Sequence, residues 1–188
     1  MESVKSQHYE VHINELAKAS LNQHIAKKGY SKIFLLVDEN TKAHCLPIFN
    51  KIIDFPIDSL LEIESGEKNK HIHTCLQLWE DLSNLDGDRK SLLINLGGGV
   101  LTDMGGFVAS TFKRGIDFIN IPTTLLSMVD ASIGGKTGIN NRFGKNLIGS
   151  FYQPKLVLID PNFIKTLNKE EIISGLGEVI KYGILSNI

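Results

Sequence analysis

The sequence of 188 residues has little cysteine, almost no net charge and no long hydrophobic run. Its two cysteines, Cys45 and Cys75, do not form a disulfide framework and are typical of a reducing compartment. A formal net charge of −1 provides no overall field that would attract nucleic acid or an anionic membrane, so neither partner is expected. No apolar run approaches the roughly 20 residues of a membrane span, and the first residues lack the apolar core of a signal peptide. We therefore expect a cytoplasmic protein.

Apolar runs of strand length alternate with helical patterns along the chain. The patterns predict strands over 9–14, 32–37, 60–64, 91–96 and 116–121, separated by helices. The first helix ends at Gly29, residues 38–41 read as a polar turn, and another helix begins near Pro47. This alternation predicts an α/β fold with a parallel sheet flanked by helices.

The last stretch predicts a helix over 168–185, with Asn168 and Glu171 in capping-box positions. At 100° per residue, one face carries Ile172, Leu176, Val179, Ile180 and Gly183, and the opposite face carries Ser174, Glu178 and Lys181. The pattern by itself fits an exposed ion pair between Glu178 and Lys181. We expect the apolar face to be exposed, because the chain stops just after this helix, an unusual end for a complete domain.

Glycines and hydroxyl groups follow two of the predicted strands. Three glycines at 97–99 stand between a strand and a helix start, where they would let a pyrophosphate approach the backbone at the helix N-terminus. The dinucleotide fingerprint is incomplete because Thr102 occupies its third glycine position, so a simple tight turn is an equal alternative. Thr123 and Thr124 follow the next strand and either cap a helix or bind a ligand.

Residues 135–137 read Gly-Lys-Thr, like the end of a phosphate-binding P-loop. A P-loop needs a glycine five residues before its second glycine, and that position is Asp130, a carboxylate where a polyphosphate would lie. The spacing therefore argues against a P-loop kinase. Cations nevertheless gather in what reads as a long loop, which favours binding of phosphate or a phosphorylated substrate; they are Lys113, Arg114, Lys136, Arg142 and Lys145.

Taken together, these motifs resemble the 3-dehydroquinate synthases, members of the sugar-phosphate cyclase family. The resemblance is carried by "GGGVLTDMGGFVASTFKRG", "IPTTLLSMVDASIGGKTGINN" and "GLGEVIKYG", is dense from Gly97 to Gly183, and extends weakly through "SGEKNK". It covers about the first half of the family's usual length. It implies a Rossmann-like NAD-binding domain over 1–165 and, over 166–188, the first helix of a missing helical C-terminal domain that binds metal and substrate. It also implies a homodimer.

The resemblance implies a phosphate-eliminating lyase of the shikimate pathway, and hence of chorismate and aromatic amino acid biosynthesis. With NAD and a divalent metal, Zn²⁺ or Co²⁺, such an enzyme converts 3-deoxy-D-arabino-heptulosonate 7-phosphate, a seven-carbon keto-sugar acid phosphate, to 3-dehydroquinate. NAD returns to its starting state, and the metal acts as a Lewis acid. Three alternatives stay open: another sugar-phosphate cyclase, a polyol dehydrogenase of the same fold, and a non-catalytic NAD-binding module.

Site residues follow from the resemblance, motif by motif. Cofactor-binding roles are implied for Asp38, Asn40, Glu67, Lys70, Gly98, Gly99, Val100, Asp103, Thr123, Thr124, Asp130, Lys136, Lys145, Phe163 and Thr166. Catalytic or substrate-contacting roles are implied for Asp130, Lys136, Asn146, Lys181 and Arg114, the last of these binding substrate phosphate across a dimer interface. Glu178 is the implied metal ligand. The family's two metal-binding histidines come from its C-terminal half, and a catalytic zinc site needs three protein ligands, so we expect this chain to be inactive alone.

Overall fold

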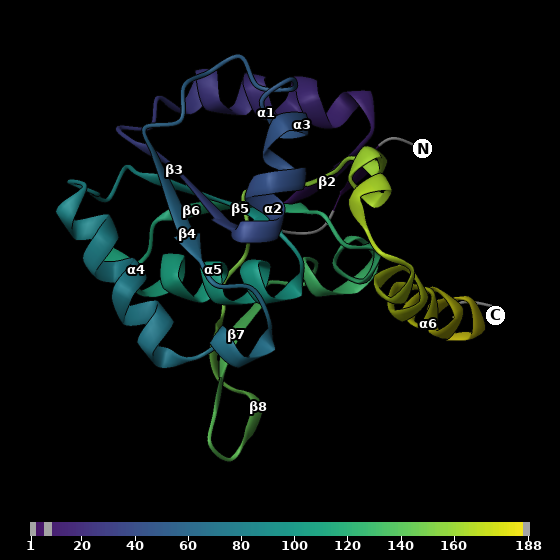
Figure 1. Cartoon of the computed structure of the whole chain (residues 1–188). Coiled ribbons are helices and arrows are strands. Elements are labelled where there is room, and N and C mark those ends of the chain that lie inside the picture. The colour runs from purple at the N-terminus through teal and green to yellow at the C-terminus, as the bar shows by residue number, and fades with distance from the viewer. Residues whose placement is uncertain (1–2, 6–8, 186–188) are drawn as a thin grey trace.

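The computed structural model describes residues 3–5 and 9–185, and its centre is a sheet of seven strands with helices on both faces (Figure 1). The strand order is β1-β2-β9-β6-β5-β3-β4. Neighbouring strands are parallel except for β1 and β2, which are antiparallel. The strands are β1 Ser3–Lys5, β2 Glu10–Ile13, β3 Ile33–Asp38, β4 Ser59–Ile63, β5 Leu92–Gly97, β6 Asp117–Pro122 and β9 Leu156–Ile159. The predicted Rossmann-like α/β fold is confirmed.

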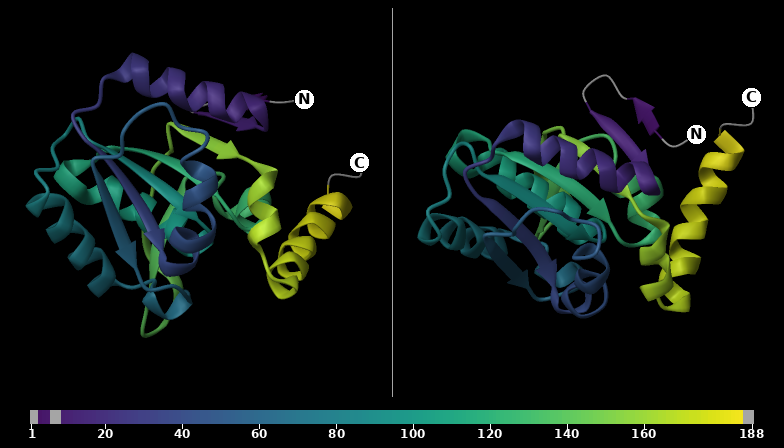
Figure 2. Two further views of the ribbon diagram at one scale, coloured as in Figure 1. Left: turned by 45° about the horizontal axis from the view of Figure 1, so that its top comes forward. Right: turned by 90° about the horizontal axis from the view of Figure 1, so that it is seen from above.

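Each face of the sheet carries its own apolar core, and helices cover both faces (Figure 2). Helix α1 (Glu15–Lys28) and the short helices α2 (Glu39–His44) and α3 (Leu46–Phe49) lie on one face, while α4 (Ile72–Asn84) and α5 (Gly99–Thr111) cover the other. Along β3, Leu35 and Val37 pack on the first face, and Phe34 and Leu36 on the second. This two-sided burial is why the strand reads as a continuous apolar run.

Two strands of the main sheet and one helix were not expected from the sequence patterns. Strand β9 is a short apolar run that follows Pro154, and β1 is a three-residue edge strand. The predicted polar turn at 38–41 is wrong, because these residues begin α2. The Asp38 side chain accepts a hydrogen bond from the Thr41 backbone N–H (2.7 Å), and the Thr41 hydroxyl accepts one from the Asp38 backbone N–H (2.9 Å). Polar residues that resembled a turn are therefore a helix cap.

The predicted long basic loop is also wrong in part, because residues 136–151 form an antiparallel hairpin of β7 (Lys136–Asn141) and β8 (Gly144–Phe151). The hairpin extends from the α5 layer, away from the main sheet (Figure 1). Positive φ angles at Gly134 and Gly135 turn the chain into β7. Because Lys136 begins a strand and no helix follows it, the geometry excludes a P-loop.

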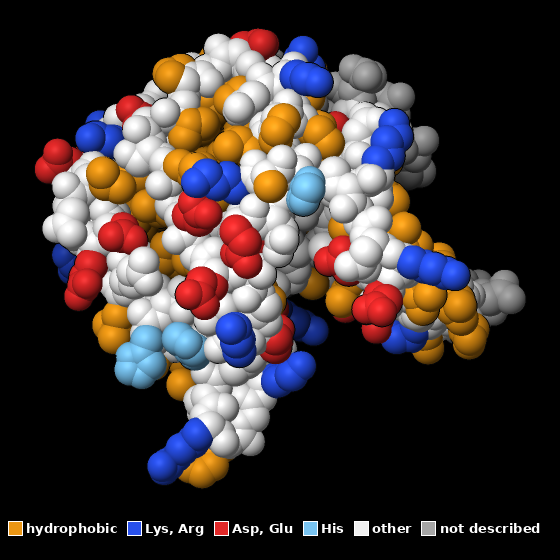
Figure 3. All heavy atoms as spheres, in the orientation of Figure 1, with side chains coloured by type: hydrophobic (Ala, Val, Ile, Leu, Met, Phe, Trp, Pro, Cys, Tyr) orange, Lys and Arg blue, Asp and Glu red, His pale blue; other side chains and the backbone are white. Residues whose placement is uncertain are grey.

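Helix α6 (Lys169–Leu185) begins with the predicted capping box. The Asn168 side chain accepts from the Glu171 N–H (2.9 Å), and the Glu171 carboxylate accepts from the Asn168 N–H (3.3 Å). The helix contacts the protein body through Gly175, which lies against Leu125, and through Tyr182, whose hydroxyl donates to Asp130 (2.6 Å). Its apolar face is exposed as expected (Figure 3), with Ile180 61% exposed.

Two adjacent glycines of helix α5 leave room for the strands that pack against it. A Cβ atom at Gly105 would lie 2.0 Å from the Asn95 side-chain oxygen, and one at Gly106 would lie 2.5 Å from Thr137 Cγ2. Gly105 thus leaves room for Asn95, which donates to the Asn120 side-chain oxygen (2.9 Å). None of the helices among the described residues combines the length and apolarity needed to cross a membrane.

We predict that Gly105→Ala lowers the free energy of unfolding by about 1–3 kcal/mol, because the added methyl group overpacks the interface between α5 and β5. The matched control is Gly177→Ala in α6, where an added Cβ meets nothing within 4 Å. This variant should raise stability by about 0.5–1 kcal/mol through helix propensity alone. Urea unfolding followed by circular dichroism measures both changes. Equal effects of the two substitutions would contradict the packing account.

Candidate functional site

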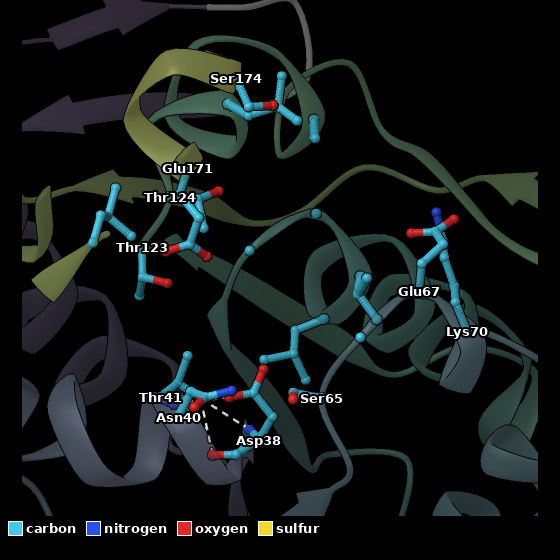
Figure 4. Close-up of a pocket in the computed structure, with 18 of the residues that line it drawn as sticks. Asp38, Asn40, Thr41, Ser65, Glu67, Lys70, Thr123, Thr124, Glu171 and Ser174 are labelled. Carbon is cyan, nitrogen blue, oxygen red and sulfur yellow. Dashed lines mark hydrogen bonds between the residues drawn. The ribbon is translucent and has the colours of Figure 1, made fainter. Parts of the chain in front are cut away.

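The candidate site lies where parallel strands end at one edge of the sheet. The chain runs outward from β3 to β4 and then returns to the other side of β3 to form β5, so the strand order reverses between β3 and β5. Ligands of open α/β sheets bind at such a reversal. A hollow of about 800 Å³ opens there, bordered by the segments that follow β3, β4, β5 and β6 (Figure 4).

Most of the predicted cofactor residues surround this hollow. Asp38, Asn40, Glu67, Lys70, Gly98, Gly99, Val100, Asp103, Thr123, Thr124, Lys145 and Thr166 line it, together with Asn146. The hollow also includes residues that the sequence analysis missed, namely Thr41, His44, Cys45, Ser65, Gly66, Leu101, Leu126, Ala131, Leu167, Asn168, Glu171 and Ser174. Ser65 and Gly66 had a usable signal, since they follow a predicted strand directly. Glu171 and Ser174 had none, because only tertiary packing brings α6 to this edge.

The glycine turn after β5 is the N-terminus of α5. Gly98 is the N-cap residue and has no side chain to cap the helix, so free N–H groups of the first turn face the hollow. Thr102 does not crowd this turn, because its side chain is buried and its hydroxyl donates to the Gly99 carbonyl (3.3 Å). The turn therefore offers backbone donors and a positive dipole end to an anion.

Thr124 caps a helical turn and also lines the hollow, so its position is compatible with both of the roles that the sequence left open. Its hydroxyl accepts from the Ser127 N–H (3.2 Å), which caps the helical turn before the π-helical segment Ser127–Ala131. It also lines the hollow. It lies against Gly98, because a Cβ atom added at Gly98 would come 3.0 Å from the Thr124 methyl group. Thr123 is buried beside it and lines the same wall.

A second hollow of about 490 Å³ adjoins the first, and Asp103, Ala131 and Asn146 line both. Asp130 and Lys136, predicted to lie at the junction of nicotinamide and substrate, line this second hollow. Lys70 lies between the two hollows. Its Nζ donates to Asp103 Oδ2 (2.6 Å) and to Asn146 Oδ1 (2.6 Å), and its side chain is only 4% exposed.

Four predicted site residues line neither hollow. Arg114 stands beyond the C-terminal end of α5, roughly 20 Å along the helix from the glycine turn. Phe163 is fully buried in the core, so its side chain is not available to a ligand. Glu178 and Lys181 form an ion pair on α6, and the hydrogen bond with Glu178 raises the pKa of Lys181. The residues that the structure describes, around Glu178 and elsewhere, include no group of three His, Cys, Asp or Glu that could hold a metal ion.

Comparison with known proteins identifies the family. The model of the 3-dehydroquinate synthase N-terminal domain matches residues 60–174. The 3-dehydroquinate synthase of Parabacteroides distasonis is 48% identical over 171 residues, which are 91% of this chain and 48% of that protein. The chain belongs to the 3-dehydroquinate synthase family. The Campylobacter jejuni subsp. doylei 3-dehydroquinate synthase is 45% identical over 95% of this chain and 48% of its own length. The chain therefore spans about half the length of the curated relatives it matches.

Solved structures agree with the family assignment. The 2-epi-5-epi-valiolone synthase of Streptomyces hygroscopicus subsp. jinggangensis, crystallised with NAD⁺ and Zn²⁺, has a TM-score of 0.76 at 29% identity, covering 96% of this chain and 51% of that one. A 2-deoxy-scyllo-inosose synthase complexed with carbaglucose-6-phosphate, NAD⁺ and Co²⁺ has a TM-score of 0.78, covering 92% of this chain and 47% of that one. At 24% identity, this second likeness concerns the fold alone.

We predict that the Asp103 carboxyl titrates above the usual aspartate value of 3.8, because burial raises its pKa more than the Lys70 cation lowers it. The folded state then binds this proton more tightly than the unfolded chain, so the contribution of Asp103 to stability falls as the pH rises above 3.8. Carbon-13 NMR of the carboxyl groups measures the titration. Asp88 is the internal reference, since hydrogen bonds led by that from Ser31 lower its pKa. An Asp103 midpoint at or below that of Asp88 would contradict the burial argument.

Proposed function

We propose that this chain is the nucleotide-binding half of a 3-dehydroquinate synthase that converts 3-deoxy-D-arabino-heptulosonate 7-phosphate to 3-dehydroquinate and phosphate. The observation that carries the proposal is the pair of adjoining hollows in a chain of this family, joined through Asp103 and Asn146. The larger hollow would hold NAD, and the smaller would hold the reacting end of the substrate. Activity, substrate and partners of the whole protein are part of this proposal, as is a cytoplasmic location.

The residues at the larger hollow fit a dinucleotide. Asp38 and Asn40 would lie at the adenosine end, and the turn at Gly98 and Gly99 would bind the pyrophosphate through backbone N–H groups. The volume of about 800 Å³ lies within the range of small-molecule sites. Two family relatives of known structure were crystallised with NAD⁺, which supports the same cofactor here. Bound NAD would supply reversible hydride transfer.

The residues at the smaller hollow fit a polar, anionic substrate. Lys136 and Asn146 would contact it, while Asp130 would face the reacting carbons and Lys145 would lie at the rim of the nucleotide site. Arg114 does not line this hollow in the single chain. We therefore propose a homodimer in which Arg114 of the second copy binds the substrate phosphate, and we propose no nucleic acid or membrane partner.

The metal site does not fit within this chain. Glu178 is the proposed ligand, and residues 3–5 and 9–185 include no group of three His, Cys, Asp or Glu that could hold a metal ion. The metal, Zn²⁺ or Co²⁺ by analogy with the solved relatives, would need ligands from outside this chain.

We predict that the 188-residue chain alone releases no phosphate from the substrate, measured by a coupled phosphate assay with the full-length Parabacteroides distasonis relative as positive control. Measurable turnover would disprove this assignment of the metal site.

The cofactor proposal is tested by calorimetric titration of the chain with NAD and, as control, with ATP. We predict selective NAD binding that Gly99→Asp weakens at least tenfold, because the new carboxylate would face the pyrophosphate at the start of α5. The matched control is Gly99→Asn, which has the same shape without the charge and should weaken binding much less. An added Cβ at residue 99 would lie 3.3 Å from the Ala131 Cβ, so both variants should carry the same small packing cost, and the helix dipole favours the acidic one. Equal loss in both variants would point to a steric effect, and ATP binding equal to that of NAD would oppose a dinucleotide site.

Another sugar-phosphate cyclase is the second candidate, favoured by the likeness to 2-epi-5-epi-valiolone synthase at 29% identity. The two candidates share the NAD site and differ in substrate. Titration of the NAD-loaded chain with a seven-carbon sugar acid phosphate and with a seven-carbon sugar phosphate that has no carboxylate would separate them, since only the former carries a carboxylate for Lys136 to bind.

A further inference from the structure

Lys70 is a buried cation whose position depends on three different segments of the chain. It follows the 3₁₀ turn Glu67–Asn69, and only 3% of the residue is exposed. Its backbone carbonyl accepts a hydrogen bond from the Asn140 N–H (2.8 Å), which joins it to β7. A buried ammonium group is costly unless it is paired and hydrogen-bonded, so its contacts have to be specific.

The ammonium group of Lys70 connects the glycine turn to the hairpin. One hydrogen bond goes to Asp103 in the first turns of α5, and the other goes to Asn146 on β8, each 2.6 Å long. These two acceptors line both hollows, whereas Lys70 has little surface left for a ligand. Lys70 therefore acts on the site mainly through Asp103 and Asn146.

The hairpin residue at this junction is held in an uncommon conformation. Asn146 has a φ of +55°, in the left-handed region that only a few residue types adopt readily. Its backbone N–H donates to the Asn140 side chain (2.9 Å), which in turn donates to the Glu67 carboxylate (2.8 Å). The neighbouring residues of β8 are exposed, so this network adds contacts near Asn146 to the pairing of β8 with β7.

We propose that Lys70 is a positioning residue that locks the hairpin to the start of α5 and thereby couples occupancy of the nucleotide hollow to the geometry of the substrate hollow. A ligand bound at the Gly98 turn restrains Asp103, and the restraint passes through Lys70 to Asn146. The coupling part of this inference rests on the proposed function. The lock between Lys70 and the hairpin does not, because it is a property of the unliganded chain.

Hydrogen exchange of the 188-residue chain, read by mass spectrometry on peptides covering 140–148, tests the lock without a ligand. Lys70→Met keeps the length of the side chain and removes both hydrogen bonds, and it should speed exchange in these peptides by roughly tenfold. Exchange in β6 should stay unchanged. Lys68→Met, at an exposed lysine on the same turn, is the matched control and should leave the hairpin as in the parent chain. Unchanged hairpin exchange in a folded Lys70→Met protein would overturn the proposal.

Two further variants keep the test decisive if Lys70→Met unfolds because Asp103 is left as an unpaired buried carboxylate. Lys70→Met with Asp103→Asn removes that charge, and the hairpin should still exchange fast. Asn146→Asp keeps an acceptor for Lys70 and tolerates positive φ, so it should preserve the lock. Fast exchange in the double variant together with slow exchange in Asn146→Asp supports the lock, and the reverse pattern refutes it.

The coupling is tested by repeating the exchange measurement with saturating NAD. In the parent chain, NAD should slow hairpin exchange severalfold, and in Lys70→Met this protection should disappear even at NAD concentrations that saturate the variant. A residue with only a general structural role would weaken binding without abolishing the transmitted protection. If the parent chain fails to bind NAD, the proposed function fails, while the unliganded comparison still decides the lock.

Discussion

The parallel alignment of six strands is the constraint on which the rest of this molecule depends. Because parallel neighbours point the same way, the ends of β3, β4, β5 and β6 meet at one edge of the sheet, and the residues that follow them are brought together from distant parts of the chain. The reversal of strand order between β3 and β5 leaves a hollow between the segments. The glycine turn, the capped start of α2 and the threonines after β6 are positioned by this one arrangement.

Close packing of α5 determines how the two hollows adjoin. Gly105 and Gly106 let this helix approach β5 and β7, so its first turns lie between the sheet edge and the hairpin. Asp103 on that helix can then face Lys70 and serve as a wall of both hollows. The raised pKa of Asp103 follows from the same burial, and the adjacent cation limits it. Helix packing and site electrostatics are thus consequences of the same small residues.

Helix α6 contacts the body through few of its residues, of which only Gly175 is buried. Gly175 and Tyr182 contact the body, with the Tyr182 hydroxyl on Asp130, while most of the large apolar side chains of the helix face outward. An exposed apolar helix face of this kind is normally covered by another protein surface. The chain matches about half the length of its curated relatives, and we propose that the remaining half of such a protein covers this face.

The sequence by itself determined the central strands, the capping box of α6 and the residues at the glycine turn, because these depend on local periodicity and on the chemistry of a few neighbouring residues. It did not reveal β1, an edge strand of three residues, or β9, an internal strand of four, because such short runs show little periodicity. It misread the start of α2 and the hairpin, since polar caps and hairpin residues share the composition of turns. Only the tertiary structure decided that Lys70 bonds to Asp103 and Asn146, that Phe163 is buried, and that Arg114 lies far from the glycine turn. The two Lys70 hydrogen bonds join residues that are 33 and 76 positions apart, and no local pattern encodes them.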